Sequence, residues 1–574
     1  MVCTIIRSSF DATVRLVNAD RTGYANHYTC LFPKVRSRRV QPMRFVAVFT
    51  IFLATLALAA CLLASGACRE APVSESTGPA TDTRSPEARK AQADAHLVKA
   101  DALFATYHIG PAQRELTAAL AVDPTHKEAR LRKAALLKNQ ANPAQAATLL
   151  DALVRDAPND PRPRRLLGGV RVEQGRFDEA IQLFETLSLA ERLAHPPTAL
   201  AYARALDQVD RLQDAADTVA SLLVTDPWFS DGYLHLAQIV ARMGRDDWAD
   251  VWVKRYRRDE PMRLGEYMAR VMETDGRPAV AQYNRGLLEM NRGRLYPAMM
   301  LFNKALQIQP SYGAVYVAQG RLSARLERPG DLLPILKKLP PHGELYGLLA
   351  ELYLAQERFD EAHRSFQQAL TEQPDDPRWL TGLADVQAAR AVTATDPLAA
   401  GRRRIRQQMQ GRGVNSTLDD LGQLARLFAD HGKTDRAREL AIFVADVAPG
   451  VPTVAQMLAT ICDRRADAFL RLHAYHQVLE RAPDADAIRR ALVEQYVDLR
   501  VRLDVADAEA TQRLSTERTT DRLVLLARVQ IAQDRADDAR ETLDNALILA
   551  PGHKEALALR RAAGPTPLSR PPSN

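Results

Sequence analysis

The chain has 574 residues, of which 46% are hydrophobic and 6% aromatic, and its formal net charge is +7. Ala, Leu, Arg and Glu dominate long stretches, which favours helices over strands. Residues 1–68 hold eight Lys and Arg against two Asp, a net charge of +6, so the remaining residues carry only +1. A body so close to neutral excludes the broad positive field that pulls proteins onto nucleic acid.

The N-terminal region contains an uncharged run of 23 residues from Phe45 to Ala67, preceded by basic residues that end at Arg44. A run of this length can cross a bilayer, and the preceding positive charge predicts a cytoplasmic N-terminus. Met43 is a candidate true start, so residues 1–42 are interpreted as an extension from a mis-assigned start. We expect residues 43–68 to be a signal peptide or an anchor that places the body outside the cytoplasm.

Within this run, Leu58-Ala59-Ala60-Cys61 resembles the lipobox of bacterial lipoproteins. The resemblance implies cleavage before Cys61 and lipid attachment to its thiol and amino group, with Cys68 as the alternative site. An uncleaved signal anchor with unmodified cysteines is the competing interpretation, because the run exceeds the usual signal core. Either interpretation predicts a membrane-anchored protein of the cell envelope with an extracytoplasmic, periplasmic body.

Two segments are predicted to lie outside the folded body. Residues 69–94 are rich in Pro, Ser, Thr and charge, so they cannot bury enough apolar surface to fold and are expected to form a flexible linker. Residues 563–574 are expected to be a disordered tail for the same reason.

The body between these segments repeats with a period of 34 residues, shown by the pairs Pro124 and Pro158, Pro227 and Pro261, and Pro449 and Pro483. The prolines that carry a recurring pattern have a small residue twelve positions before them, a large apolar residue eight before and a small or apolar residue five before: Pro124, Pro158, Pro227, Pro310, Pro374 and Pro551. Two clear examples are Ala298-Phe302-Ala305-Pro310 and Ala362-Phe366-Ala369-Pro374. Offsets of four and three place these side chains on one helical face, and the proline ends the helix. With the helix upstream, each unit is predicted to be an antiparallel hairpin.

This unit resembles the tetratricopeptide-repeat family. The resemblance implies an all-α fold, a right-handed α-solenoid of about 12–13 antiparallel helix hairpins, preceded by one N-terminal hydrophobic helix. We expect one array over residues 95–392, a basic irregular break over 393–416 and a second array over 417–562. We also expect each hairpin to pack only against its neighbours in the sequence. Longer proline intervals, such as Pro261 to Pro310, predict insertions, and the stretch Asp331 to Leu336 predicts a shortened unit.

In such a solenoid the first helix of each unit lines the concave face, where this family commonly binds extended peptides or partner helices. The expected groove positions change from basic to apolar to acidic along the chain: Arg162, Arg165, Arg204, Tyr283, Leu287, Met290, Glu344, Glu351 and Leu354. The Lys, Asn and Arg set with which chaperone-binding members of the family clamp a terminal carboxylate is not supplied here.

No motif predicts catalysis, a cofactor, a metal or a small-molecule substrate. His431-Gly432-Lys433-Thr434 contains the end of a phosphate loop, but Leu427 stands where that loop requires glycine, and the segment falls in a predicted turn. His473 and His476 lack a third metal ligand and are interpreted as partly exposed polar residues. Cys462 is interpreted as a small buried side chain.

One basic run, Arg402-Arg403-Arg404 followed by Arg406, is interpreted as solvated charge, with contact to an acidic partner or phosphate as the alternative. The whole sequence leads to the hypothesis of a non-enzymatic, membrane-tethered scaffold that binds proteins or peptides in its concave groove during an envelope process such as assembly, export or secretion. The alternative is a substrate-presenting accessory or regulatory subunit of an enzyme complex such as a glycosyltransferase or protease.

Overall fold

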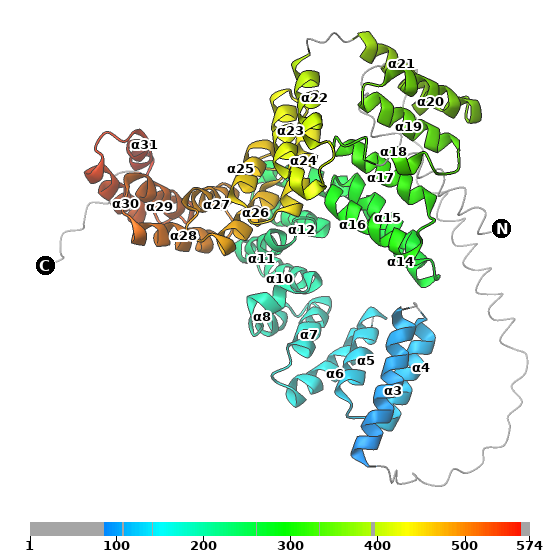
Figure 1. The fold of residues 1–574 in the computed structure, drawn as a ribbon. Coiled ribbons are helices and arrows are strands. Elements are labelled where there is room, and N and C mark those ends of the chain that lie inside the picture. Colours follow the sequence, from blue (N-terminus) through cyan, green and yellow to red (C-terminus); the bar gives the residue numbers. More distant parts are fainter. Residues whose placement is uncertain are drawn as a thin grey trace, which may run out of the picture. The chain divides into compact units, whose positions relative to one another are not determined.

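The computed structural model describes residues 85–563 apart from 106–107, 141, 260, 332 and 392–395, and every regular element among them is a helix. Most of these helices pair with the next one in the chain as antiparallel hairpins (Figure 1). Twelve such hairpins occur in the described residues: α3 (Pro86–Ala105) with α4 (Ile109–Val122), α5 (Lys127–Asn139) with α6 (Pro143–Asp156), α7 (Pro161–Glu173) with α8 (Phe177–Glu185), α10 (Pro196–Gln208) with α11 (Leu212–Thr225), α12 (Ser230–Arg242) with α13 (Asp246–Asp259), α15 (Pro278–Asn291) with α16 (Leu295–Ile308), α17 (Gly313–Arg325) with α18 (Leu333–Leu336), α19 (Gly343–Ala355) with α20 (Phe359–Glu372), α23 (Leu418–Asp430) with α24 (Thr434–Val447), α25 (Pro452–Ile461) with α26 (Ala468–Arg481), α27 (Asp486–Leu499) with α28 (Leu503–Thr516), and α29 (Thr520–Ala532) with α30 (Ala536–Leu549). The predicted α-solenoid of 12–13 hairpins is confirmed.

The other helices stand outside these pairs: α9 (Leu189–Leu193), α14 (Pro261–Thr274), α21 (Pro377–Ala391), α22 (Pro397–Met409), the short 3₁₀ helix η1 (Val414–Thr417) and α31 (Lys554–Ala562). They explain the uneven spacing of the prolines. Helix α14 occupies the predicted insertion after Pro261, whereas α18, with only four residues, is the shortened second helix of its unit.

The repeated prolines end the second helices as expected. Helix α4 ends at Val122 and Pro124 follows two residues later, and the same distance separates Leu549, the last residue of α30, from Pro551. Proline has no backbone N–H to donate, and its ring clashes with the carbonyl of the preceding turn. The chain therefore leaves the helix at these points and enters the next hairpin.

Small and large side chains alternate at the contact between helices, which holds each hairpin together. On α16, Ala298, Phe302 and Ala305 are all fully buried. The Phe302 ring lies against Gly286 of α15, where an added Cβ would approach the ring carbons to 2.5 Å. A glycine on the first helix thus leaves the space that the ring of the second helix fills.

The expectation that hairpins pack only against their sequence neighbours is wrong. Helix α11 packs against α26, and α16 packs against α24, although more than a hundred residues separate each pair. At the contact of α16 with α24, the Tyr296 and Phe443 ring centroids lie 6.0 Å apart. Helix α26 also contacts α13, where the ring centroids of Trp252 and Phe469 lie 5.3 Å apart. Units of the first array therefore share a core with units of the second.

The hydrophobic core follows this arrangement. One cluster of buried residues runs from Ala180 to Leu326 and continues from Ile405 to Val529. A separate cluster lies between these stretches in sequence, from Val317 to Val386, and belongs chiefly to the α17–α21 region. The chain thus leaves the main core after α17 and returns to it with α22.

The segment 393–416 also differs from its prediction. Its central part is helix α22 rather than an irregular break, and Ile405 and Met409 on this helix are buried in the main core. Asp396 caps the helix by accepting from the backbone N–H of Leu398, and Pro397 occupies its first position, a favourable arrangement at a helix N-terminus.

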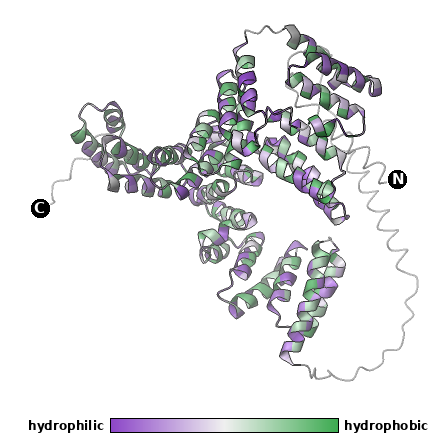
Figure 2. Ribbon diagram, viewed as in Figure 1, coloured by the Kyte–Doolittle hydropathy of each residue, from purple (hydrophilic) through white to green (hydrophobic). Residues whose placement is uncertain are grey.

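Residues 86–94 of the predicted linker are not a flexible segment, because α3 begins at Pro86 and its Ala93 is fully buried, whereas residues 69–84 lie outside the described residues. The predicted extension 1–42, the signal or anchor 43–68 with its hydrophobic helix, and the tail after Ala563 lie outside the described residues. Among the helices that are described, none combines the length and apolarity needed to cross a membrane. Hydrophilic and hydrophobic residues mix along them (Figure 2).

Candidate functional site

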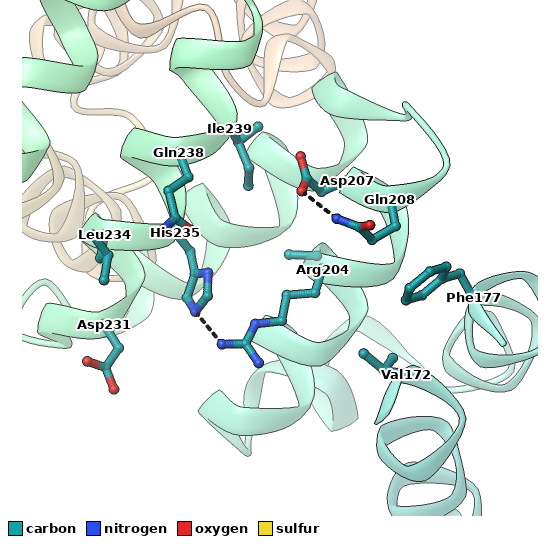
Figure 3. Close-up of a pocket in the computed structure, with 11 residues that line it drawn as sticks. Val172, Phe177, Arg204, Asp207, Gln208, Asp231, Leu234, His235, Gln238 and Ile239 are labelled. Carbon is teal, nitrogen blue, oxygen red and sulfur yellow. Dashed lines mark hydrogen bonds between the residues drawn. The ribbon is translucent and has the colours of Figure 1, made fainter. Parts of the chain in front are cut away.

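A pocket of about 530 Å³ opens on the first helices of three successive hairpins, α7, α10 and α12. Its lining combines apolar and polar side chains (Figure 3): Val172, Phe177, Ala203, Arg204, Asp207, Gln208, Asp231, Leu234, His235, Gln238 and Ile239. We call this the groove pocket. The first helices, which are predicted to line the recognition face, supply every lining residue except Phe177, the first residue of α8.

Arg204 and His235 point toward one another across the groove pocket (Figure 3). The guanidinium Nη2 of Arg204 lies 3.2 Å from Nε2 of His235. Guanidinium groups only donate, so the Nε2 atom accepts and the ring proton is on Nδ1. Burial, with the charge of Arg204 as a second cause, lowers the pKa of His235. His235 is therefore a neutral side chain at neutral pH, and Arg204 supplies a positive charge at the pocket wall.

The rim beside Arg204 is held by contacts between successive hairpins. Arg242 of α12 donates both to the Asp207 carboxylate and to the Asp207 backbone carbonyl, the latter at 2.6 Å. Gln208 donates to the same carboxylate at 3.4 Å. These contacts fix the end of α10 against α12, so the pocket wall is formed before any ligand arrives.

The remaining lining offers both kinds of contact that a peptide needs. Phe177 and Leu234 supply apolar surface, while the Gln238 amide is exposed and can both donate and accept. A peptide segment brings backbone N–H and C=O groups together with side chains, so an amide beside an apolar wall can bind both. The pocket is suited to binding a polypeptide.

Of the nine predicted groove positions, Arg204 lies in the groove pocket, and Met290 and Glu351 line a second pocket described below. Arg162 instead connects two successive hairpins, and Glu344 connects α19 to α21. The Arg162 Nη2 atom lies 2.6 Å from Glu128, and Glu344 accepts from Arg378 at the same distance. Both pairs join residues 34 apart, so one register position is linked to its equivalent in the next unit.

The other predicted positions have mainly packing roles. The Tyr283 ring lies 5.3 Å from the ring of Tyr312, and burial raises the pKa of its hydroxyl. Leu287 and Leu354 are partly buried against the cores. Arg165 is half-buried, and burial followed by the charge of Arg162 lowers its pKa. Sequence reasoning missed His235 and Gln238, although His235 lies 31 residues after Arg204, close to one repeat.

The motifs that were set aside in the sequence have structural roles. Lys433 follows Gly432, whose φ of +70° makes the tight turn between α23 and α24. His473 Nδ1 lies 2.8 Å from the carbonyl of Val224, and His476 Nε2 lies 2.7 Å from the Tyr496 hydroxyl, so the two rings contact different partners. Cys462 is buried as expected, and burial raises the pKa of its thiol to about 12.

The fold and the groove pocket define the class of protein: an α-solenoid of helix hairpins, a fold that supports a scaffold for protein–protein interaction. A family model described as tetratricopeptide repeat matches residues 109–168 and 332–386, which lie in both the early hairpins and the α18–α21 region. The family model thus identifies tetratricopeptide repeats in these two segments, as the sequence pattern predicted. Proteins of this type are typically non-enzymatic scaffolds.

Several solved structures resemble the chain. A tetratricopeptide-repeat protein from Parabacteroides merdae is 17% identical, with 46% of this chain and 98% of that chain covered and a TM-score of 0.20. The Cut9–Hcn1 hetero-tetramer of the APC/C is 14% identical over 84% of this chain and 99% of that chain, with a TM-score of 0.23. The P58(IPK) repeat domain is 13% identical over 82% of this chain and 97% of that chain, with a TM-score of 0.18. No curated protein matches the sequence.

Proposed function

We propose that this chain is a membrane-tethered scaffold of the bacterial cell envelope that holds a segment of a partner protein in its groove pocket. The scaffold would organise a process such as assembly, export or secretion. The observation that carries the binding role is the groove pocket itself, in which three successive first helices present Arg204, His235 and exposed amides beside apolar surface. The apolar run from Phe45 to Ala67 and its preceding basic residues support the tether.

The binding role is tested with two matched substitutions. Gln238→Lys places a long cationic side chain in the groove pocket beside Arg204, whereas Gln368→Lys makes the same change at an exposed position on a second helix, α20. Tagged full-length chains are expressed in the native cells, cross-linked and recovered from detergent-solubilised membranes. The partners are then quantified by mass spectrometry.

We expect Gln238→Lys to reduce recovery of the main partner about tenfold, which corresponds to about 1.4 kcal/mol, and Gln368→Lys to leave recovery unchanged. Equal recovery by both variants and the parent would refute binding in the groove pocket. An enzyme among the partners lost with Gln238→Lys would support the accessory-subunit function in place of an assembly or export role.

The tether is tested by mass spectrometry of the mature N-terminus. A lipoprotein would begin at a diacylglyceryl-modified Cys61, or Cys68, and a signal anchor would retain the apolar run and resist carbonate extraction. A chain that is recovered unmodified in the carbonate-soluble fraction would contradict membrane attachment.

A further inference from the structure

A second pocket of about 540 Å³ lies where the second array returns to the first. Its walls come from α15, α17 and α19 on one side and from α22, α23 and α24 on the other. Met290 and Glu351, two of the predicted groove positions, belong to this lining, so the pocket continues the face expected to bind a partner. We call it the clasp pocket.

Most of the charged side chains that line the clasp pocket are basic. Two carboxylates, Glu327 and Glu351, face five cationic side chains: Arg321, Arg325, Arg402, Lys433 and Arg436. This local excess contrasts with the near-neutral charge of the body as a whole. A concave site lined by one sign of charge concentrates the opposite charge more strongly than a flat surface does.

Ion pairs inside the protein do not remove this excess. Glu327 is 3% exposed and pairs with Arg402, Arg406 and Arg436. Glu439 pairs with Arg325 and, at 3.1 Å, with Arg436. In these contacts, four guanidinium groups share two carboxylates, and Arg321 shares the Glu344 carboxylate with Arg378. Burial lowers the pKa of Arg406. The negative charge of Glu327 raises this pKa, and the positive charge of Arg402 lowers it further.

The geometry holds these cations in place rather than leaving them to rotate in solvent. The guanidinium carbons of Arg402 and Arg436 lie 5.6 Å and 5.8 Å from the ring centroid of Phe428. Stacking on one ring, together with the ion pairs to Glu327, restricts both side chains. A ligand therefore meets donors that have already lost much of their rotational freedom.

Lys433 adds one more cation to the lining of the clasp pocket. It lies in the α23–α24 turn, is exposed, and makes no ion pair among the contacts recorded for the described residues. A compact ammonium group at the mouth of a basic pocket can approach an incoming carboxylate with little rearrangement of its neighbours.

We propose that the clasp pocket binds acidic side chains of the partner segment that occupies the groove, so that the partner carries a cluster of Glu or Asp. This inference rests on the proposed function and specifies the chemistry of the segment that is bound. Partly buried guanidinium groups in excess over carboxylates are stabilised when a ligand supplies the missing anions. Carboxylates accept charge-assisted hydrogen bonds from guanidinium groups, and these are stronger than neutral ones.

The test uses a fluorescein-labelled peptide of eight glutamates and the purified full-length chain, with binding followed by fluorescence anisotropy at low salt. Lys433→Glu reverses the charge at the pocket mouth without removing a recorded ion pair. Lys304→Glu is the matched control, because Lys304 is an exposed lysine on α16 that does not line the pocket. This control is needed because residues 1–68 carry a net charge of +6 and can also attract the peptide.

We expect saturable binding that weakens as salt rises, about a tenfold weaker affinity for Lys433→Glu, and parental affinity for Lys304→Glu. Binding that is absent, or that weakens equally in both variants, would overturn the proposal. Complete displacement of the peptide by millimolar inorganic phosphate would also overturn it, because the pocket would then select a small anion and not an acidic segment.

The two proposals fail in different ways. If Gln238→Lys abolishes partner recovery but the glutamate peptide does not bind, the scaffold function stands and the acidic chemistry is wrong. If the peptide binds with the expected Lys433 dependence but no partner depends on Gln238, the clasp pocket stands as an anion site and the proposed function fails.

Discussion

At the scale of single residues, Glu327 connects the two arrays. Its φ of +58° places it in the left-handed region directly after α17, which is uncommon for a residue with a side chain. Burial alone would raise the pKa of its carboxyl group, but Arg406, Arg402 and Arg436 reverse this and lower the pKa overall. The ionised carboxylate therefore stabilises the fold at pH values above the ordinary pKa of a glutamate. This stabilisation is lost as the pH falls through the lower pKa that Glu327 has in the folded protein.

Replacing this carboxylate tests its role. Glu327→Gln keeps the size of the side chain but leaves three guanidinium groups without their shared anion, so we expect a loss of about 3 kcal/mol at pH 7. Urea unfolding followed by tryptophan fluorescence measures it.

Glu357→Gln is the control for this change. Glu357 has nearly the same backbone conformation, with φ of +62°, but it is exposed and pairs only with Arg403 among the recorded ion pairs of the described residues. We expect its substitution to cost less than about 1 kcal/mol. Equal losses of unfolding free energy for the two variants would contradict a stabilising role of the buried ion cluster.

At the scale of helical elements, several helix contacts place a glycine of one helix against an aromatic ring of another, as Gly286 does with Phe302. Gly347 of α19 faces Trp379 of α21, and a Cβ added at Gly347 would lie 2.2 Å from the indole. Trp379 is fully buried in the separate core of the α17–α21 region. This contact therefore stabilises a part of the chain whose core is not continuous with the main one.

Gly347→Ala is expected to destabilise that region by about 1–3 kcal/mol, because the rigid indole must move to admit the methyl group. Hydrogen exchange should accelerate in residues 343–391 and stay unchanged in α27–α30. Gly422→Ala is the control, since its added Cβ would meet only the flexible Met457 side chain at 3.4 Å, and we expect it to be neutral or up to about 1 kcal/mol stabilising. Faster exchange throughout the chain would contradict an independent core.

At the scale of the whole molecule, a turn of the second array contacts a helix of the first. The Asp217 carboxylate of α11 accepts the backbone N–H of Arg502 at 2.6 Å, and the Arg502 guanidinium donates to Ser221 at 2.6 Å. Arg500 and Arg502 both have positive φ, so the turn between α27 and α28 is bent tightly where it meets α11. Burial raises the pKa of Asp217 from its ordinary 3.8 to about 6.

A raised carboxyl pKa means that folding favours the protonated form. The stabilisation from protonating Asp217 is fully present below about pH 4 and is lost as the pH rises through about 6. Asp217→Asn removes the charge while keeping an acceptor, so we expect it to stabilise the chain by about 1 kcal/mol at pH 8 and to have no effect at pH 4. Urea midpoints at both pH values measure the difference. Asp214→Asn, at an exposed position on the same helix where the carboxylate pairs with Arg211, is not expected to stabilise the chain at pH 8, and equal stabilisation by both variants would contradict the assignment.

The sequence by itself determined the repeating unit, because everything that defines a hairpin lies within about 34 residues. The spacing of Pro124, Pro310 and Pro551 marked the ends of second helices, and the pattern of Ala298, Phe302 and Ala305 marked the face that is buried. The extra length after Pro261 likewise marked the place of α14. One member of the groove pocket, Arg204, followed from the same register.

Only the tertiary structure decided which distant units meet. Contact between α11 and α26 depends on rotations summed over many hairpins and on the added helices α14, α21 and α22, and no local pattern records such a sum. For this reason the sequence alone predicted that the basic run around Arg402 is solvated. In the structure, Arg402 and Arg406 pair with the Glu327 carboxylate, which lies 75 and 79 residues away in the sequence. The periodic sequence determines which side chains each hairpin buries. The rotations summed along the array determine which charged side chains from distant hairpins come into contact.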